Sequence, residues 1–456
     1  MYDVIVIGCG PGGYAAAIRT AQLGGKAAIV EPAEVGGTCV NRGCIPAKVW
    51  HQAASLLRAT RKGEDYGIQV LGTKVDLKTL VERKVGVSAE IRMGMEGLLA
   101  NNGVELIRAS AVLGAGREVR IEGKPFQAKA VVVASGSEPS VPDVPGLSEA
   151  LWTTDQVLDM TEVPASVLVW GADFIEVEMA NVLNVFGAKV ILATRAGRIL
   201  PREDHDTSQR VGQALREQGI EIATRSDLKS VEKTGEGFVC TLTGAKERAV
   251  SAARILVGSR RPRTAGIGLE AAGVLLSEDG AIRVNDRLET SVQGIYAVGD
   301  CTGGWMLSHA ATLMGVVAAE NAMGQPNKFP FHLIPRASWT FPEVGAVGLS
   351  EEEAEKQGKE IEVGLFPYSI NGLAMCRNEV DGAVKVIADA KYGEILGVHI
   401  VGSQATELVG EAVLAMQLEC TAREFARSLR VHPTFSEAVV DGARDADKWA
   451  LYLPRR

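Results

Sequence analysis

Two cysteines five positions apart, Cys39 and Cys44, are the residues of this chain best suited to chemistry. Thiols at this spacing on a regular helix would point about 140° apart, so a disulfide between them requires a bend in the backbone. Gly36, Gly37 and Gly43 flank the pair and permit such a bend. The alternative interpretation is that two reduced cysteines lie in a glycine-rich loop.

The residues after Cys44 add a second property. Pro46 suits the first turn of a helix, which places Cys44 near a helix N-terminus. The positive end of the helix dipole stabilises a thiolate at such a position. The segment therefore predicts that Cys44 ionises readily.

A glycine motif precedes the cysteines. An apolar strand leads into Gly8-x-Gly10-x-x-Gly13, which opens a helix rich in small residues. The glycines permit a tight turn, close approach of a pyrophosphate, and close packing of the helix on the strand. The next apolar strand ends in Glu31, where a carboxylate that binds ribose belongs. This combination predicts a βαβ unit that binds a dinucleotide.

A second βαβ unit begins with the apolar strand at 165–170, but its glycine motif departs from the pattern. Gly171 is kept, whereas Asp173 and Glu176 stand where the other two glycines belong. Asp173 would set a negative charge against a pyrophosphate. Two like charges about 4 Å apart cost about 1 kcal/mol in water and about 4 kcal/mol at an effective dielectric constant of 20.

The carboxylate that would bind the 2′-hydroxyl of NAD is also missing from this unit. Thr194 stands at its place, followed by Arg195 and Arg198. The arginines could hold a 2′-phosphate, or they could be ordinary surface residues. We therefore expect the second unit to bind NADH poorly, with NADP binding through the arginines as the rival expectation.

Several segments together resemble the flavoprotein disulfide reductase family (class I pyridine nucleotide-disulfide oxidoreductases), and within it the dihydrolipoamide dehydrogenases. The resemblance covers nearly the whole chain. It is carried by the segments at 36–48, 134–139, 295–300, 306–309 and 432–437.

The resemblance implies a disulfide relay. Cys39 would exchange with a dithiol substrate, and Cys44 would contact the flavin of FAD. Thiol–disulfide exchange needs a thiolate and therefore a base. The resemblance assigns that role to His432, with Glu437 orienting the imidazole ring.

The resemblance also implies the surroundings of the cofactors. Lys48 would lie near the flavin and form an ion pair with Glu178, beside the nicotinamide. Asp300 would hold the ribityl chain. The residues expected to bind FAD are Gly8, Gly10, Gly13, Glu31, Lys48, Gly136, Gly299, Asp300, Met306, Leu307 and His309. Those of the doubtful second nucleotide site are Gly171, Asp173, Glu178, Thr194 and Arg195.

The expected fold class is α/β, with two Rossmann-like dinucleotide-binding domains and a C-terminal α+β dimerisation domain. The FAD-binding domain would span 1–146, and the pyridine-nucleotide-binding-like domain with its degenerate glycine motif 147–264. A central domain completing the FAD site would span 265–330, and the interface domain 331–456. The family places the catalytic histidine against the partner's disulfide, so we expect a homodimer.

Bulk properties exclude other classes of protein. A chain of 456 residues with a net charge of −8 and no basic run is not expected to bind nucleic acid. No apolar stretch predicts a membrane span, and no leader opens the sequence. The 7 cysteines do not form a secreted disulfide scaffold, so we expect a reducing, cytoplasmic location. No spacing predicts a metal site. Five cysteines are predicted to be small buried residues: Cys9, Cys240, Cys301, Cys376 and Cys420.

Three hypotheses follow. The first is an enzyme like dihydrolipoamide dehydrogenase that passes electrons between a lipoyl-type dithiol, the Cys39–Cys44 disulfide, FAD and normally NAD or NADP. The second keeps the lipoyl chemistry but does not use NAD(P) efficiently. The third is a non-catalytic FAD-binding partner subunit. The expected substrate is a lipoyl-bearing protein, or a small disulfide as second choice.

Overall fold

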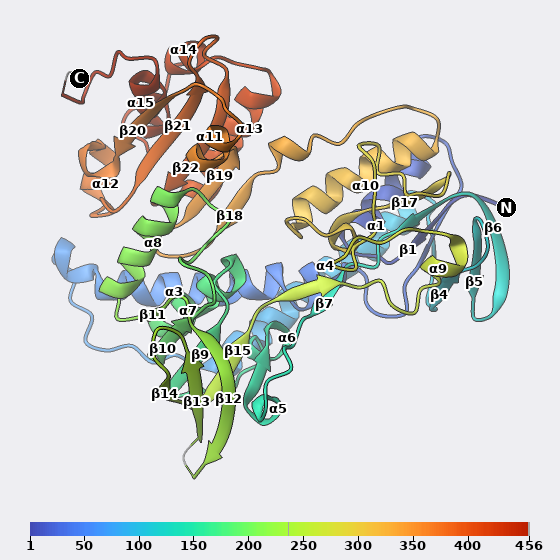
Figure 1. Cartoon of the computed structure of the whole chain (residues 1–456), viewed down its shortest axis with the longest axis horizontal. Helices are drawn as coiled ribbons and strands as arrows, with labels where there is room; N and C mark the ends of the chain where they lie inside the picture. The colour runs from blue at the N-terminus through green and yellow to red at the C-terminus, as the bar shows by residue number, and fades with distance from the viewer. Residues whose placement is uncertain (236, 455–456) are drawn as a thin grey trace. The chain divides into compact units, whose positions relative to one another are not determined.

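The computed structural model describes residues 1–235 and 237–454, and they form two compact units (Figure 1). Unit 1 contains residues 1–141, 153–162 and 259–330. Unit 2 contains residues 142–152, 163–258 and the chain from Phe331 onward. Each unit thus contains parts of three of the four predicted domains, whose boundaries stay predictions. No helix of the described chain is long and apolar enough to cross a membrane.

Unit 1 is built on a sheet with a parallel centre in the order β3-β2-β1-β6, with β17 also pairing with β6. The central strands are runs of buried aliphatic residues, as expected where both faces of a parallel sheet are covered. A Cβ on Gly315 of α10 would lie 2.2 Å from the carbonyl oxygen of Gly12 on α1, so these two helices pack backbone to backbone. The elements are β1 (Tyr2–Ile7), α1 (Pro11–Gln22), β2 (Ala27–Val30), β3 (Glu105–Ile107), β6 (Lys124–Val133), β17 (Ile295–Ala297) and α10 (Ser308–Ala322).

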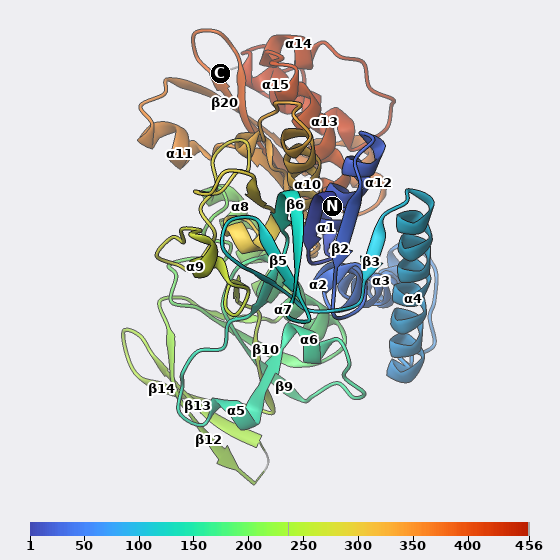
Figure 2. The ribbon, with the colours of Figure 1, turned by 90° about the vertical axis from the view of Figure 1, so that its right-hand side faces the viewer.

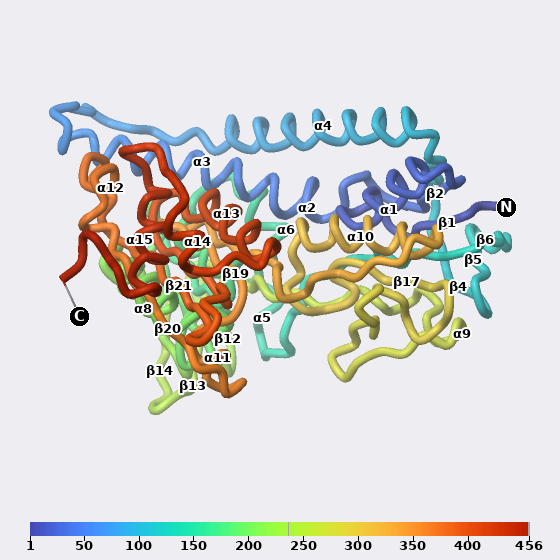
Figure 3. Tube along the Cα trace, turned by 90° about the horizontal axis from the view of Figure 1, so that it is seen from above, coloured from blue at the N-terminus to red at the C-terminus, as the bar shows by residue number. Residues whose placement is uncertain are grey.

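The rest of unit 1 surrounds this sheet. The helices α3 and α4 lie side by side (Figures 2 and 3), and β4 and β5 extend the sheet in antiparallel fashion beyond β6. These elements are α2 (Gly37–Asn41), α3 (Cys44–Arg61), α4 (Leu77–Asn101), β4 (Ala111–Leu113), β5 (Glu118–Ile121), β7 (Ser137–Pro139), α6 (Thr154–Val157), β16 (Arg260–Pro262), α9 (Leu269–Ala272) and the 3₁₀ helix η2 (Gly299–Thr302).

Unit 2 begins with a second parallel sheet, in the order β11-β10-β9-β15 with β8 at its edge. An antiparallel sheet β12-β13-β14 belongs to the same region. The elements are α5 (Leu147–Ala150), β8 (Leu151–Thr153), β9 (Ser166–Trp170), α7 (Phe174–Val185), β10 (Lys189–Ala193), α8 (His205–Glu217), β11 (Glu221–Ala223), β12 (Asp227–Thr234), β13 (Gly237–Thr243), β14 (Arg248–Ala252) and β15 (Arg254–Val257).

The C-terminal part of unit 2 is an antiparallel sheet in the order β18-β19-β22-β21-β20, covered by helices. A Cβ on Gly364 of β20 would lie 2.0 Å from the carbonyl oxygen of Gly442, so α15 packs directly on the strand. The elements are β18 (Arg336–Ser338), β19 (Val344–Gly348), α11 (Glu351–Lys356), β20 (Ile361–Pro367), α12 (Gly372–Cys376), β21 (Ala383–Asp389), β22 (Ile395–Val401), α13 (Ala405–Gln417), α14 (Ala422–Ala426) and α15 (Ser436–Ala446). Two dinucleotide folds and a C-terminal α+β region confirm the predicted fold class.

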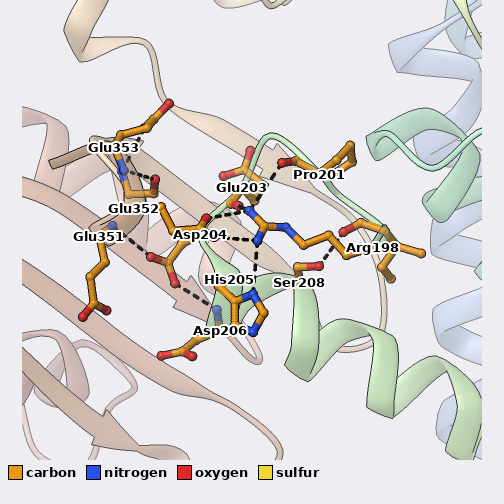
Figure 4. A network of polar contacts seen from close by, with 12 residues as sticks. Arg198, Pro201, Glu203, Asp204, His205, Asp206, Ser208, Glu351, Glu352 and Glu353 are labelled. Atoms are coloured by element: carbon orange, nitrogen blue, oxygen red, sulfur yellow. Dashed lines mark hydrogen bonds and ion pairs between the residues drawn. The ribbon is translucent and has the colours of Figure 1, made fainter. Parts of the chain in front are cut away.

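An ionic network, buried at Lys385 and Asp204, connects the N-terminus of α8 to α11 and β21 within unit 2 (Figure 4). The ammonium of Lys385 contacts Asp204 at 2.9 Å, Asp206 at 2.7 Å and Glu351 at 2.8 Å. Burial lowers the pKa of Lys385, but hydrogen bonds to the three carboxylates outweigh burial and raise it overall. Because every charge in the cluster has a partner, the desolvation cost is offset locally.

Candidate active site

The predicted bend between the two cysteines is present. Cys39 lies on the short helix α2, which ends at Asn41, and Cys44 is the first residue of α3. Gly36 and Gly37 adopt positive φ values of 92° and 58° at the start of α2, a conformation that favours glycine. The break between the two helices turns both sulfur atoms toward each other, which a single continuous helix would not do.

The two thiols have opposite ionisation properties. A hydrogen bond between the sulfurs and burial raise the pKa of the Cys39 thiol. The same hydrogen bond, a second one to the Ser308 hydroxyl and the positive charge of Lys48 lower the pKa of the Cys44 thiol to about 7, against the opposing effect of desolvation. Both are free thiols in the structure. These effects favour a negative charge on Cys44 over one on Cys39, which is the direction predicted from the position of Cys44 at a helix N-terminus.

Lys48 and Glu178 belong to different units. Lys48 lies one turn along α3 from Cys44 and acts electrostatically on that thiol. Glu178 is buried on α7 and accepts a hydrogen bond at 2.9 Å from the backbone N–H of Trp339. The expected ion pair between them stays a prediction.

The first glycine motif forms an open cradle. Gly8 has a φ of 102°, and a Cβ there would lie 2.3 Å from the carbonyl oxygen of Ala134. A Cβ on Gly13 would lie 2.0 Å from the oxygen of Gly8, so the helix packs on the strand end. A Cβ on Gly10, in contrast, would meet nothing within 4 Å. Tight packing on two sides and open space at Gly10 fit the approach of a pyrophosphate.

The carboxylate of Glu31 is fixed at the end of β2. It accepts hydrogen bonds from the backbone N–H groups of Cys9 at 2.8 Å and Ala33 at 2.9 Å. These contacts hold the side chain beside the glycine turn. The arrangement fits a ribose-binding acid, as predicted for FAD.

The second predicted FAD segment lies in the same unit. Burial raises the pKa of Asp300, which accepts a hydrogen bond at 2.6 Å from Ser137, itself bonded to Arg260. Gly136 and Gly299 take positive φ values of 74° and 72°. A half-buried carboxylate beside two such turns suits a polar cofactor chain.

The run from 306 to 309 leads into helix α10. Met306 has a φ of 49°, a strained value for a residue with a side chain, and Leu307 is the N-cap of the helix. Strained residues concentrate at functional sites. His309 is exposed. The flavin-contact roles of these three residues stay predictions.

His432 and Glu437 are in contact at the C-terminal end of unit 2. His432 Nδ1 and Glu437 Oε1 are 2.9 Å apart, and Glu437 Oε2 accepts a hydrogen bond at 2.9 Å from the backbone of Thr434. Glu437 lies in the first turn of α15, and 77% of the His432 side chain is exposed. The carboxylate thus holds one ring nitrogen and leaves the rest of the imidazole accessible, as a base–orienter pair requires.

The second glycine motif is filled by side chains. Asp173 caps α7, accepting a hydrogen bond from the N–H of Phe174 at 2.9 Å, and lies 3.9 Å from the guanidinium of Arg202. The side chain of Glu176 is buried, and its carboxylate lies within 3 Å of where a Cβ on Gly171 or Gly258 would be. The side chains of Asp173 and Glu176 thus lie where the turn in unit 1 has only glycine, and weak binding of a pyrophosphate here stays a prediction.

The neighbouring polar residues are occupied by contacts within the protein. The Thr194 hydroxyl accepts a hydrogen bond from the N–H of Ala196 at 3.1 Å. Arg195 pairs with Asp227 at 2.7 Å and lies over the ring of Trp170. Arg198 binds both oxygens of Glu352, at 2.8 and 2.6 Å, in the ionic network of Figure 4.

Sequence reasoning missed two residues. Ser308 contacts Cys44, and its only signal was its place in the 306–309 run. Arg202, which approaches Asp173, had no signal in the sequence. The prediction of buried cysteines was correct for Cys9, Cys240 and Cys301, but wrong for Cys376, which is exposed, and for Cys420, which is only partly buried. Cys376 is the last residue of the short helix α12, whereas Cys420 follows α13 and packs against the edge of the C-terminal core. No cluster of potential metal ligands occurs in the described parts of the chain.

Comparison with known proteins agrees with this geometry. Residues 2–315 match the pyridine nucleotide-disulphide oxidoreductase family, and residues 334–443 match its dimerisation domain. A dihydrolipoyl dehydrogenase of Thermus scotoductus is 39% identical over 460 residues, covering 100% of this chain and 99% of the relative. One from Bacillus subtilis is 34% identical and covers 99% of both chains.

Solved structures give the same result. The crystal structure of LpdA from Mycobacterium tuberculosis is similar with a TM-score of 0.89 and 26% identity, covering 97% of this chain and 99% of that one. The HOCl-induced flavoprotein disulfide reductase RclA from Escherichia coli has a TM-score of 0.85 and 25% identity, over 96% of this chain and 99% of that one.

The chain therefore belongs to the pyridine nucleotide-disulphide oxidoreductase family. It is an oxidoreductase similar over its full length to dihydrolipoyl dehydrogenases, and the family implies FAD and a pyridine nucleotide as cofactors. The dimerisation domain implies a homodimer. The comparisons support the first hypothesis and do not favour the other two.

Proposed function

We propose that this protein oxidises a protein-bound dihydrolipoyl group to the lipoyl disulfide and passes the electrons to NAD or NADP. The observation that carries the proposal is the pair of thiols at the bend between α2 and α3, where the surroundings lower the pKa of Cys44 and raise that of Cys39. Dihydrolipoyl dehydrogenases as full-length relatives support the choice of dithiol. A cytoplasmic location is part of the proposal, because it suits a chain with reduced cysteines outside the redox pair.

The chain's own residues account for the thiol chemistry. A substrate thiolate attacks Cys39, a sulfur–sulfur bond forms to Cys39, and the bond to Cys44 breaks with Cys44 leaving as a thiolate. The second substrate thiol then attacks the mixed disulfide, forming the substrate disulfide and releasing Cys39 as a thiol.

Each side chain around the thiols has one task in this sequence. Lys48 stabilises the charge left on Cys44. His432 takes one of the two protons that the substrate loses, Cys39 takes the other, and Glu437 holds the imidazole ring in place. FAD, held by the cradle at Gly8–Gly13 with Glu31 and Asp300, supplies two-electron redox chemistry when bound. In the homodimer, His432 of one protomer serves the thiol pair of the partner subunit.

The experiment is anaerobic addition of dihydrolipoamide to the oxidised holoenzyme while the flavin spectrum is recorded. We expect a long-wavelength band from a thiolate next to oxidised flavin, absent in Cys44→Ser although FAD stays bound. Cys376→Ser, which removes an exposed cysteine, is the matched control and should keep the band. A normal band in Cys44→Ser would remove Cys44 from this role.

The pH dependence follows from the lowered pKa of Cys44. Only the thiolate produces the band, so its intensity should rise as the pH increases through about 7 and fall below it. A band that is independent of pH between 6 and 8, to within about a tenth, would contradict that assignment, because a group with a pKa near 7 changes most of its ionisation in this range.

The base is tested by His432→Gln. Loss of a general base should slow dithiol oxidation by about 10²–10⁴-fold with FAD retained, and Glu437→Gln should act in the same direction but more weakly. The matched control is His332→Gln, since His332 is an exposed histidine outside the 432–437 segment. A fully active His432→Gln enzyme, or an active monomer by light scattering, would overturn this part.

A further inference from the structure

We propose that Ser308 is a positioning residue that donates a hydrogen bond to the thiolate of Cys44 and so keeps the charge of the reduced pair on that sulfur. Ser308 Oγ lies 3.0 Å from Cys44 Sγ, although the two residues are 264 positions apart in the chain. The inference rests on the proposed thiol chemistry and adds a residue to it.

The backbone fixes Ser308 in this position. It is the first residue of α10, after the N-cap Leu307 and the strained Met306. Its carbonyl oxygen accepts a hydrogen bond from the Thr312 hydroxyl at 3.0 Å, and the helix packs closely on α1. The hydroxyl is therefore presented by a rigid helix start rather than by a mobile loop.

Charged and titratable groups face the thiol pair from three elements. They are Lys48 on α3, Asp300 in η2 and Tyr14 on α1. Lys48 favours the thiolate of Cys44, whereas the charge of Asp300 disfavours ionisation of Cys39. The Ser308 hydroxyl also reaches Cys39, where its effect on the pKa is smaller than that of the hydrogen bond that Cys39 donates to Cys44.

A donor at this position changes the balance between the oxidised and reduced pair. A dithiol substrate gives up two electrons and two protons. The enzyme disulfide takes both electrons and one proton, which leaves Cys39 as a thiol and Cys44 as a thiolate, and the other proton goes to His432. A hydrogen bond that exists only to the thiolate stabilises the reduced form, and therefore makes the disulfide a stronger oxidant.

The test compares Ser308→Thr with Ser308→Val in the holoenzyme. These two side chains have the same branched shape at the helix start, but only threonine carries a hydroxyl. After reduction with excess dithiothreitol, the rate of iodoacetamide alkylation of Cys44 is followed against pH by peptide mass spectrometry. Ser277→Ala, which removes a hydroxyl from an exposed loop of unit 1, is the control for an unrelated serine.

We expect Ser308→Val to raise the apparent pKa of Cys44 by about one unit, the size typical of a hydrogen bond to a charged group. Ser308→Thr and Ser277→Ala should stay close to the wild type. The long-wavelength flavin band should shift to higher pH by the same amount. FAD content, measured in every variant, shows that the site is folded.

Two results would overturn the proposal: a Cys44 titration that is the same in Ser308→Val and Ser308→Thr, or a shift confined to Cys39. If Ser308→Val loses FAD, Ser308→Ala takes its place in the same comparison with Ser308→Thr. The readout is separate from substrate turnover. Failure to oxidise dihydrolipoamide would therefore count against the proposed function, and an unshifted Cys44 would count against Ser308.

Discussion

The two glycine turns of this protein have nearly the same backbone and very different side chains. In unit 1, the N–H of Gly8 donates to the carbonyl of Val30 at 2.9 Å, and in unit 2 the N–H of Gly171 donates to Ala193 at the same distance. Both glycines have positive φ values, 102° and 133°. Both turns therefore keep the strand–turn–helix geometry, although different residues occupy the second and third positions of the motif.

The position of the ribose acid is also equivalent. Glu31 accepts a hydrogen bond from the N–H two residues later, on Ala33. Thr194 does the same with Ala196. Thr194 thus performs the local structural task of Glu31, but it has no second oxygen or negative charge to offer a ligand.

The difference lies in how the space above the turn is used. Gly10 in unit 1 has open space around it, and Asp173 stands at the equivalent position in unit 2. Gly13 packs on Gly8, and at the equivalent position the buried carboxylate of Glu176 lies against Gly171. The two turns thus differ in what their glycines do: Gly10 leaves open space for a ligand, and Gly13 lets the helix pack against the backbone of the turn. The predictions below test this difference.

The largest effect is expected when the third glycine of the first motif is replaced by glutamate, the residue at the equivalent position of the second motif. Gly13→Glu should abolish FAD binding, because even a Cβ at this position lies 2.0 Å from the oxygen of Gly8, and overpacking by one side chain costs about 1–3 kcal/mol or more. The measurement is bound flavin per protomer. Gly97→Glu, at an exposed glycine of α4, is the matched control and should retain FAD. Full flavin content in Gly13→Glu would show that the first turn tolerates the geometry of the second.

Features that depend on residues close together in the chain could be predicted from the sequence. The strands at 3–7 and 27–30, the bend between Cys39 and Cys44, and the helix start at Cys44 followed from apolar runs, glycines and Pro46, because these features act locally. The His432–Glu437 contact was reached only through the family resemblance.

Contacts between distant segments could not be predicted in the same way. Ser308 meets Cys44, and Glu352 meets Arg198, across large separations in sequence. From the sequence alone Arg198 is a candidate ligand for a 2′-phosphate, because its contact with Glu352 cannot be predicted from local features. The negative charge of Asp173 follows from the sequence, but the proximity of Arg202, whose positive charge faces it, does not.

The second largest effect is expected from restoring the glycines of the second turn. Asp173→Gly with Glu176→Gly should strengthen NADH binding by about tenfold or more, since it removes a charge near the pyrophosphate and frees space at Gly171. Loss of the helix cap at 173 should cost only a few tenths of a kcal/mol, because glycine is itself an acceptable cap. Anaerobic titration of the flavin with NADH gives the dissociation constant.

The matched control is Asp173→Asn with Glu176→Gln, which removes the charges and keeps the side chains. If charge dominates, this variant should recover most of the gain, and if space dominates it should recover little. Tight NADH binding by the wild type, unimproved by the glycines, would mean that the turn admits the nucleotide by other contacts.

A smaller effect is expected at Arg202. Its guanidinium is 3.9 Å from Asp173, and both side chains are about 40% exposed, so the pair itself contributes at most about 1 kcal/mol to stability. Arg202→Gln should weaken NADH binding a few-fold in the wild type by leaving Asp173 without a countercharge. In the Asp173→Gly background, the same change should have no effect if Arg202 only neutralises Asp173. A loss that persists there would show that Arg202 holds the nucleotide directly.

The smallest effect is expected at Thr194, and it concerns the preference between NAD and NADP rather than the affinity for either nucleotide. Thr194→Glu places a carboxylate at the end of β10, where Glu31 stands at the end of β2, and its second oxygen is free to accept from a ribose 2′-hydroxyl. The same charge repels a 2′-phosphate. The ratio of kcat/KM for NAD to that for NADP should therefore rise by about tenfold, the worth of one hydrogen bond or charge contact near 1.4 kcal/mol. Thr194→Gln, which supplies an acceptor without the charge, separates the two causes: it should improve NAD without penalising NADP. An unchanged ratio in Thr194→Glu would mean that the paired Arg195 and Asp227, rather than the residue at 194, set the preference for the nucleotide.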